Sequence, residues 1–325
     1  MKSNLGKYVS NCTRIILSTF MLVTLVAITA QAQYSGGSYG GGSSYGGDSG
    51  SGRCDDSRYS GDWSSGSGNL RVVGLTADQR LICFDEDKPS EASTIGKVSG
   101  LITDTKLVGI DFRPATGFNS DGSLDSGDLY GLGNAGGVYT LDLSTAQATF
   151  KSRLNAALSG TSFGVDFNPV VDRLRIVSDN GQNLRANVDT GATIVDGTLN
   201  YTPGTPATGI TGAAYTNNDA DPNTATTLYN IDSMLDQGNI QAPPNAGTLN
   251  PTGKLTVDTT PTIGFDIYST IRDNSTVDVR GLASLVTGGQ ARFYRITLFT
   301  GKATLRGTFS SQNQVTGIAI PLNQL

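Results

Sequence analysis

A five-residue phrase recurs five times between residues 108 and 320, and this repeat constrains the fold more than any other feature of the chain. Each copy has glycine in second place, Asp or Ala in fourth place and an apolar or aromatic residue in fifth place, at 108–112, 163–167, 211–215, 263–267 and 316–320. Successive glycines are 55, 48, 52 and 53 residues apart. A period near 50 residues is typical of one four-stranded β-propeller blade. The repeat therefore predicts an all-β fold, a β-propeller of five four-stranded blades.

The ends of the repeat predict how the ring closes. Three strand-like segments at 70–75, 79–85 and 93–98 lack an opening phrase, whereas the phrase at 316–320 has no blade after it. The C-terminal strand is therefore expected to complete the first blade, which closes the ring. The repeated glycine suits the innermost strand, where crowding favours a residue without Cβ. An open β-solenoid is the alternative, but it would not need a displaced terminal phrase.

The first 32 residues have the pattern of a secretory signal peptide. Lys2, Lys7 and Arg14 precede an apolar run at 15–30, and the run ends in Ala-Gln-Ala at Ala32. Cleavage is expected after Ala32. The alternative is an uncleaved anchor, but an apolar run of 16 residues is short for a hydrocarbon core of about 30 Å. The mature chain is thus expected to be extracellular or periplasmic, without a membrane span.

Residues 33–69 differ in composition from the repeated body at 70–325. Gly, Ser and Tyr dominate this segment, and such a segment buries too little apolar surface to offset its backbone entropy. We predict a flexible tail. Its spaced tyrosines, Tyr34, Tyr39 and Tyr45, are alternatively contacts for a surface or for other copies of the chain.

Charge and histidine content exclude several classes of function. Removal of the signal peptide leaves 20 Lys and Arg against 28 Asp and Glu, a formal charge of −8. An acidic protein is a poor partner for nucleic acid, which is bound mainly through basic patches. The chain contains no histidine, which removes Ser-His-Asp catalysis and His-ligated zinc.

Several segments of the body resemble a bacterial family catalogued as domain of unknown function 4394. The resemblance covers about residues 70–325 and is most specific at 163–185. It rests on Val108-Gly-Ile-Asp-Phe-Arg-Pro114, Leu129-Tyr-Gly-Leu132, Val138-Tyr-Thr-Leu-Asp-Leu143, Phe163-Gly-Val-Asp-Phe-Asn-Pro169, Asp172-Arg-Leu-Arg-Ile-Val177, Asn183-Leu-Arg185 and Thr211-Gly-Ala-Ala-Tyr215. The resemblance implies an exported, propeller-like protein. It implies no catalytic residue, because the family has no established activity.

Three opening phrases carry an aspartate in the same place. Asp111, Asp166 and Asp266 occupy it, and Ala214 and Ala319 replace them in the other two copies. Three carboxylates near the propeller axis can bind a cation, or two can share a proton for acid–base work. The alternative, which we favour, is that each accepts hydrogen bonds from turn amides of its own or a neighbouring blade, because a repeated residue suits a repeated local role.

Long polar segments join the first and second strands of three blades, at 113–128, 216–226 and 268–278. They are expected to be loops that place Asp and Asn around one face. In the first of them, oxygen-bearing residues around a glycine partly match a calcium loop, namely Asn119, Asp121, Asp125 and Asp128. Such residues also form turns without metal. Calcium is the only cofactor indicated, and a plain polar turn is the favoured alternative.

Loops on the opposite face are rich in side chains that donate and accept hydrogen bonds. Such groups suit a glycan or another hydroxyl-rich ligand, and they are equally what tight turns require. The candidates for ligand binding are Asn134, Asp179, Asn180, Gln182, Asp236, Gln237 and Gln290. The sole tryptophan, Trp63, lies in the tail, so the body has no tryptophan on which a sugar could stack.

Two cysteines remain after signal removal, Cys54 and Cys83. An exported protein favours a disulfide between them, and the alternative is a buried Cys83 with a free Cys54.

Three functions are compatible with these features. The leading one is a non-catalytic binding or scaffold propeller for a glycan, protein or other extracellular ligand. The second is a carboxylate-dependent hydrolase or lyase, which strongly raised pKa values at the channel carboxylates would favour. The third is a self-assembling surface or matrix component, which tail-dependent self-association would favour.

Overall fold

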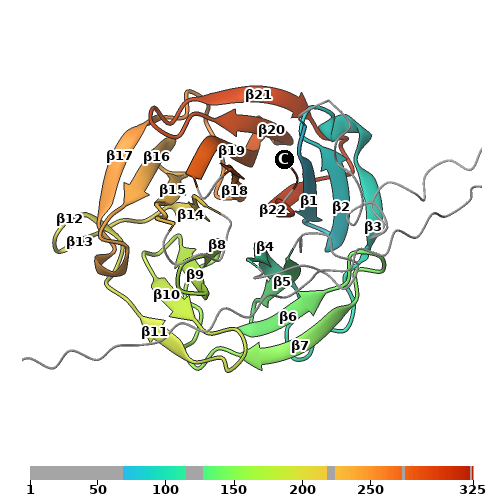
Figure 1. Ribbon diagram of the computed structural model, residues 1–325, viewed down its shortest axis with the longest axis horizontal. Helices are drawn as coiled ribbons and strands as arrows, with labels where there is room; N and C mark the ends of the chain where they lie inside the picture. Colours follow the sequence, from blue (N-terminus) through green and yellow to red (C-terminus); the bar gives the residue numbers. More distant parts are fainter. Residues whose placement is uncertain (1–68, 115–126, 218–223, 273–274, 323, 325) are drawn as a thin grey trace, which may run out of the picture. The chain divides into compact units, whose positions relative to one another are not determined.

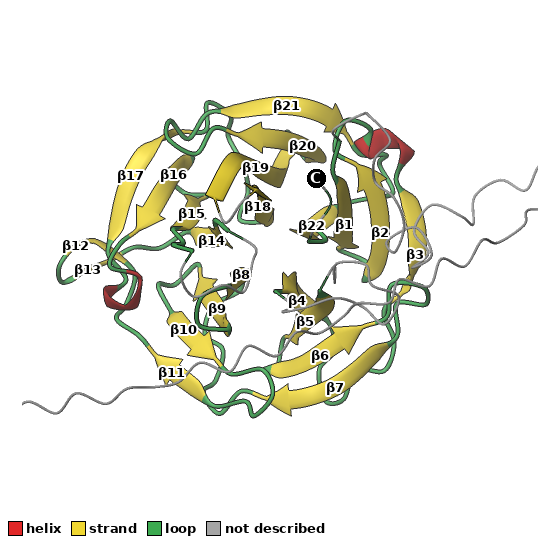
Figure 2. Cartoon of the chain, viewed as in Figure 1, coloured by secondary structure: helices red, strands yellow, loops and turns green. Residues whose placement is uncertain are grey.

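The structure is a computed structural model that describes residues 69–114, 127–217, 224–272, 275–322 and 324. Five four-stranded antiparallel sheets form a ring around a central axis (Figure 1). Helical structure in the described residues is limited to two short 3-10 turns, Pro89–Glu91 and Pro244–Ala246 (Figure 2). No helix among these residues is long and apolar enough to cross a bilayer. The predicted all-β, five-bladed propeller is confirmed.

The blades are numbered here in chain order, and each is given from its inner to its outer strand (Figure 1). Blade 1 contains β22 (Val315–Ala319), β1 (Arg71–Thr76), β2 (Arg80–Asp85) and β3 (Ser93–Lys97). Blade 2 contains β4 (Leu107–Arg113), β5 (Asp128–Gly133), β6 (Gly137–Leu141) and β7 (Ala148–Arg153). Blade 3 contains β8 (Phe163–Asn168), β9 (Arg173–Ser178), β10 (Asn183–Ala186) and β11 (Thr193–Val195).

Blade 4 contains β14 (Ile210–Tyr215), β15 (Leu228–Asp232), β16 (Gln237–Gln241) and β17 (Leu249–Lys254). Blade 5 contains β18 (Ile263–Arg272), β19 (Ser275–Thr287), β20 (Gln290–Ile296) and β21 (Ala303–Thr308). A small additional ladder between blades 3 and 4 pairs β12 (Asn200–Thr202) with β13 (Thr205–Pro206). Sequence analysis did not predict this ladder.

The C-terminal strand closes the ring as predicted. β22 pairs antiparallel with β1, with Val73 opposite Ala319 and Leu75 opposite Gly317. The side chain of Gln324 extends this closure, because it accepts a hydrogen bond from the Arg71 amide at 2.7 Å and donates one to the Arg71 carbonyl at 2.9 Å. Residues from the two ends of the described chain therefore share one blade.

The hydrophobic core lies between blades rather than within them. Each of five buried clusters draws its side chains from two neighbouring blades. At the interface of blades 5 and 1, Phe84, Phe293 and Phe309 pack edge to face, with ring centroids 4.9 to 6.1 Å apart. Such aromatic pairs stabilise beyond their buried area. A single blade has no complete core of its own, so each depends on both neighbours.

One predicted loop, 268–278, is wrong in its described part. Residues 268–272 and 275–278 continue the β18–β19 ladder, with Tyr268 opposite Arg280 and Thr270 opposite Asp278. Its polar composition suggested a loop, but β-branched and aromatic residues among the Ser and Asp residues suit a strand. The other two predicted loops, 113–128 and 216–226, lie partly outside the described residues.

The repeated glycines permit close approach of neighbouring inner strands. A Cβ on Gly164 would lie 2.6 Å from the Ala213 amide nitrogen, and one on Gly264 would lie 2.7 Å from the Ile318 amide nitrogen. Real Cβ atoms do not come this close to backbone atoms. In contrast, a Cβ on Gly317 would have its nearest contacts at 3.7 Å. The same glycine is thus sterically required in two blades and replaceable in a third.

This difference predicts the effect of two matched substitutions. Gly264→Ala should lower the free energy of unfolding by about 1–3 kcal/mol, because β18 and β22 must separate to admit the methyl group. Gly317→Ala should leave stability unchanged or slightly higher, since alanine reduces the entropy of the unfolded chain. Urea denaturation of both variants checks this, and equal effects would contradict the proposed close approach.

Candidate functional site

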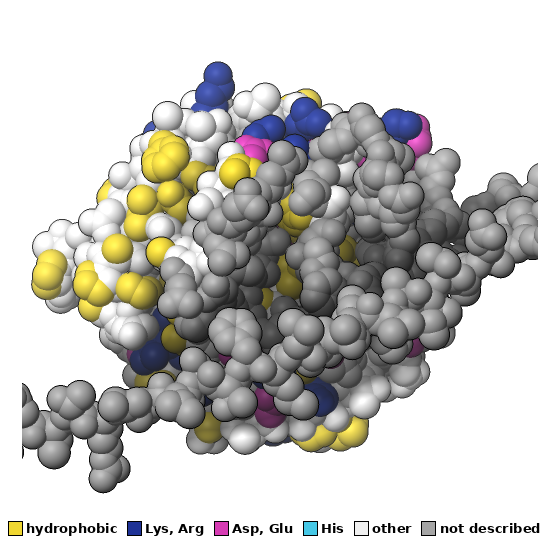
Figure 3. All heavy atoms as spheres, in the orientation of Figure 1, with side chains coloured by type: hydrophobic (Ala, Val, Ile, Leu, Met, Phe, Trp, Pro, Cys, Tyr) yellow, Lys and Arg dark blue, Asp and Glu magenta, His cyan; other side chains and the backbone are white. Residues whose placement is uncertain are grey.

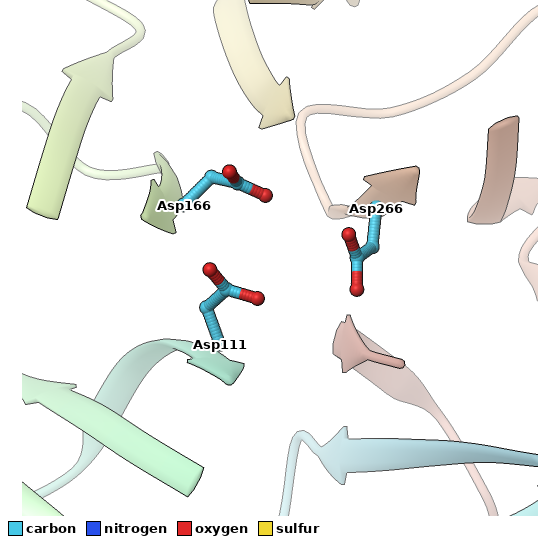
Figure 4. Close-up of side chains that lie close together, drawn as sticks. All are labelled: Asp111, Asp166 and Asp266. Carbon is cyan, nitrogen blue, oxygen red and sulfur yellow. The ribbon is translucent and has the colours of Figure 1, made fainter. Parts of the chain in front are cut away.

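Three aspartates converge at one end of the propeller axis. Asp111 comes from β4, Asp166 from β8 and Asp266 from β18, and their carboxyl groups point toward one another (Figure 4). One oxygen from each lies within 4.8 Å of the others. All three residues are at most 6% exposed. We call this group the axial carboxylates.

Each axial carboxylate accepts a hydrogen bond from the next blade. Asp111 accepts from the Phe167 amide at 2.6 Å, Asp166 accepts from the Tyr215 amide at 3.0 Å, and Asp266 accepts from the Ile320 amide at 2.6 Å. Every donor is the residue that follows the equivalent position in the neighbouring opening phrase. The repeat therefore produces a repeated inter-blade bond.

A fourth equivalent amide bonds within its own blade. Blade 5 follows the alanine-bearing phrase of Ala214, and its Ile267 amide donates to the other oxygen of Asp266 at 2.6 Å. The three carboxylates thus accept from four of the five equivalent amides of the ring. Since a buried amide without a partner is costly, this arrangement stabilises the inner strands.

Burial and mutual repulsion keep these carboxyl groups from ionising readily. Burial raises the pKa of Asp266 to about 6. Burial and the Asp266 charge raise the pKa of Asp111 well above its ordinary value. For Asp166, burial and the charges of both neighbours raise the pKa strongly. The cavity that adjoins the cluster is about 20 Å³, which is room for one water or a small cation.

The opposite end of the axis holds an open pocket of about 190 Å³. Its walls come from residues that precede or begin the inner strands of blades 1, 2, 3 and 5, together with the β1–β2 turn. The lining residues are Ala77, Gln79, Lys106, Leu107, Val108, Thr161, Ser162, Phe163, Pro261, Thr262, Ile263 and Thr316. We call it the axial pocket. Sequence analysis did not predict it, because no shared motif marks these positions.

Polar groups of the axial pocket have free hydrogen-bonding capacity. The Lys106 side chain is exposed and forms no ion pair with another described residue. The hydroxyls of Ser162 and Thr262 make no hydrogen bond within the described part of the chain. Phe163 adds an apolar surface beside them. The pocket can therefore offer one cation, several hydroxyls and one aromatic ring to a small ligand.

The seven predicted ligand-binding residues lie outside the lining of the axial pocket. Asn134 accepts from the Thr105 and Lys106 amides, and Asp179 accepts from the Thr161 amide at 2.9 Å. These two side chains hold segments that line the pocket. Their own contact with a ligand stays a prediction.

The other five candidates also bond within the protein. Asn180 donates to the Ser159 hydroxyl, and Gln182 accepts from the Ser159 amide. Asp236 accepts from the Thr259 amide at 2.9 Å. Gln237 of blade 4 donates to the Tyr201 hydroxyl, and Gln290 of blade 5 donates to the Phe309 carbonyl. Their role in binding likewise stays a prediction.

The calcium and disulfide predictions fall partly outside the described residues. Asn119, Asp121 and Asp125 lie there, and Asp128 is an exposed residue at the start of β5. Cys83 is buried in β2 and is disulfide-bonded. Cys54 lies outside the described part of the chain, so its pairing stays a prediction.

Fold and site define a five-bladed β-propeller with a buried carboxylate cluster at one end of its axis and an open pocket at the other. The family model described as "Domain of unknown function (DUF4394)" matches residues 80–319. The chain belongs to this family, as its sequence motifs indicated. No curated protein matches the chain.

The solved structures that match the chain include three of low sequence identity. A chain from a nidogen/laminin complex is 14% identical with a TM-score of 0.42, covering 79% of this chain and 100% of its own length. A protein of unknown function from Bacteroides thetaiotaomicron is 15% identical with a TM-score of 0.39, covering 79% and 68%. An auxiliary nutrient binding protein from the same organism is 15% identical with a TM-score of 0.35, covering 76% and 53%.

The axial carboxylates predict how stability depends on pH. Because Asp266 has a folded pKa of about 6, above the unfolded value of about 3.9, the native state binds more protons between these values. The free energy of unfolding should therefore fall as pH rises from about 4 through about 6. Exposed carboxylates with lowered pKa values, such as Asp142 and Asp189, have the opposite effect, because protonating them as pH falls lowers the free energy of unfolding.

Denaturation in urea at a series of pH values from 3 to 8 measures this profile. Stability should peak at mildly acidic pH, and a profile that rises from pH 5 to pH 8 would contradict the assigned direction.

Proposed function

We propose that this chain is an exported, non-catalytic propeller that binds a small hydroxyl-rich ligand, such as one sugar unit of a glycan, in the axial pocket. The observation that carries the proposal is the 190 Å³ pocket, with polar side chains from several blades around it. This volume is below the range of about 300–1,000 Å³ that suits drug-sized ligands. A single sugar unit, or the end of a longer chain, fits this scale.

The groups at the pocket suit a sugar more than a purely apolar ligand. The hydroxyls of Ser162 and Thr262 can donate to and accept from sugar hydroxyls. Lys106 can donate to a hydroxyl or to the carboxylate of an acidic sugar. The Phe163 ring can pack against the apolar C–H face of the sugar ring. These three kinds of contact, from four side chains, thus match a ligand with both polar and apolar faces.

Charge at the surface supports a partner other than nucleic acid. On the described part of the face drawn in Figure 3, Lys and Arg side chains are scattered singly among polar and apolar ones, and several lie beside acidic side chains. A nucleic-acid site would gather basic groups into one patch. Together with the predicted mature charge of −8, this favours a neutral or weakly acidic ligand.

A carboxylate-dependent enzyme is the second candidate, and the raised pKa values of the axial carboxylates favour it. The geometry of the cluster argues against it. All three carboxyl groups accept bonds from backbone amides, and the adjoining cavity of about 20 Å³ has no room for a substrate. A catalytic acid must come within hydrogen-bond reach of the reacting atom. The axial carboxylates are better explained as structural groups.

Binding by the axial pocket is tested with a glycan array and then by calorimetry on the sugars that bind. Lys106→Ala and Ser162→Trp should each weaken binding at least about tenfold, or about 1.4 kcal/mol, by removing a donor and by filling the pocket. Lys302→Ala is the matched control, because Lys302 is also exposed but lies outside the pocket lining. An array without binding, or binding that all three variants retain, would refute the assigned pocket.

Export has its own test. Expressed in a bacterial host with its own leader, the chain should be recovered outside the cytoplasm with Gln33 as its first residue, since cleavage is expected after Ala32. N-terminal sequencing or intact-mass measurement determines this. A cytoplasmic protein that begins at Met1 would contradict export.

A further inference from the structure

The axial carboxylates link three pairs of neighbouring inner strands through bonds from the amides of Phe167, Tyr215 and Ile320. We propose that they form a proton-dependent clasp, in which Asp166 keeps its proton at neutral pH and loss of that proton loosens the inner ring. This inference concerns how the ring is held together. It is independent of any ligand in the axial pocket.

The number and length of the hydrogen bonds identify Asp166 as the carboxyl group that stays protonated. Amide donors stabilise the ionised form of a carboxylate. Asp266 accepts two such bonds, from Ile267 and Ile320, and Asp111 accepts one short bond, from Phe167 at 2.6 Å.

Asp166 accepts one longer amide bond, on Oδ1, from Tyr215 at 3.0 Å. Carboxyl oxygens within 4.8 Å of one another cannot all carry a negative charge in a buried site. The group that receives the weakest amide donation ionises last. A proton on Oδ2 of Asp166 can be donated to a neighbouring carboxylate, which turns repulsion into a hydrogen bond.

Among the described residues, no cation faces the cluster to offset its charge. The described side chains that line the cavity beside it include the titratable Tyr215 of β14 and Tyr268 of β18, but no Lys or Arg. The Tyr268 hydroxyl accepts from the Gln324 amide, and the Tyr215 hydroxyl accepts from the guanidinium of Arg175 in β9.

Among the inner strands, β4 carries a cationic side chain that the structure describes. Arg113 of β4 donates to Asp172 and Asp189, so its charge is already paired. Neither β8 nor β22 contributes a basic side chain within its bounds. Protonation is therefore the available way to reduce the repulsion among the described residues.

Loss of a proton affects the spacing of the inner strands, because the carboxylates belong to different blades. Asp111 and Asp166 lie on neighbouring inner strands, and Asp166 is bonded to the strand of blade 4. Repulsion between them opposes the close approach of β4, β8 and β14. Burial and the charges of Asp111 and Asp266 raise the pKa of Asp166, which agrees with this assignment.

The test compares three Asp→Asn variants of the full chain. Asp166→Asn retains an oxygen for the Tyr215 amide, and its NH2 group replaces the shared proton. At pH 7.5 this variant should have a folding equilibrium constant about tenfold or more above the unmodified protein, equivalent to one pKa unit. At pH 4.5 the two proteins should be similarly stable.

Two matched variants separate the clasp from a simple change in charge. Asp266→Asn removes the same charge but has one acceptor oxygen for two amides, so it should lose stability at pH 4.5. Asp87→Asn, at an exposed position, should leave the pH profile unchanged. A gain at pH 7.5 in Asp166→Asn alone supports the clasp.

A direct measurement follows the carboxyl carbons by 13C NMR during a pH titration. The Asp166 carboxyl should remain protonated at pH 7. An ordinary pKa near 4 at Asp166, or an Asp166→Asn variant that is no more stable than the unmodified protein at pH 7.5, would overturn the proposal. Calcium or magnesium that stabilises the unmodified protein at pH 7.5, but not Asp166→Asn, would also overturn it and assign a cation to the cluster.

Discussion

Pairing of β22 with β1 is the interaction on which the other parts of this propeller depend. Each hydrophobic cluster belongs to two blades, so an unclosed chain would leave blades 1 and 5 each with one exposed apolar face. Closure brings Phe84 against Phe293 and Phe309 and brings the Ile320 amide to Asp266. The hydrophobic interface and the axial hydrogen bond between these blades thus form in the same event, which is expected to make unfolding cooperative around the ring.

The blade count and the closure could be predicted because they are properties of a local repeat. Each blade contains one copy of the five-residue phrase. The displaced copy at 316–320 identifies the closing strand without any knowledge of packing. The extended β18–β19 hairpin could not be recognised, because Ser and Asp residues in 268–278 are compatible with both a loop and a solvent-exposed ladder. Their pairing is decided by the partner strand, as for Thr270 opposite Asp278, and local composition does not contain that information.

The candidate site was predictable only in part, for a related reason. The repeat placed Asp111, Asp166 and Asp266 at one level of the axis, but their hydrogen bonds depend on how far each inner strand is staggered from the next. The absence of a carboxylate at Ala214 explains why Asp266 also accepts a bond from the Ile267 amide of its own blade. The axial pocket has no counterpart in the repeat, since Lys106, Thr161 and Thr262 lie in connections of unrelated sequence that only the ring brings together.

The two ends of the axis share their supporting strands. β4 contributes Val108 to the pocket wall and Asp111 to the carboxylates, β8 contributes Phe163 and Asp166, and β18 contributes Ile263 and Asp266. Each pair is three residues apart, about 10 Å along a strand, and a strand inside a packed sheet moves largely as a unit. A shift in the spacing of these strands at the carboxylate end would therefore reach the pocket walls. The shape of the pocket and the contacts among the carboxylates therefore depend on the same spacing of β4, β8 and β18.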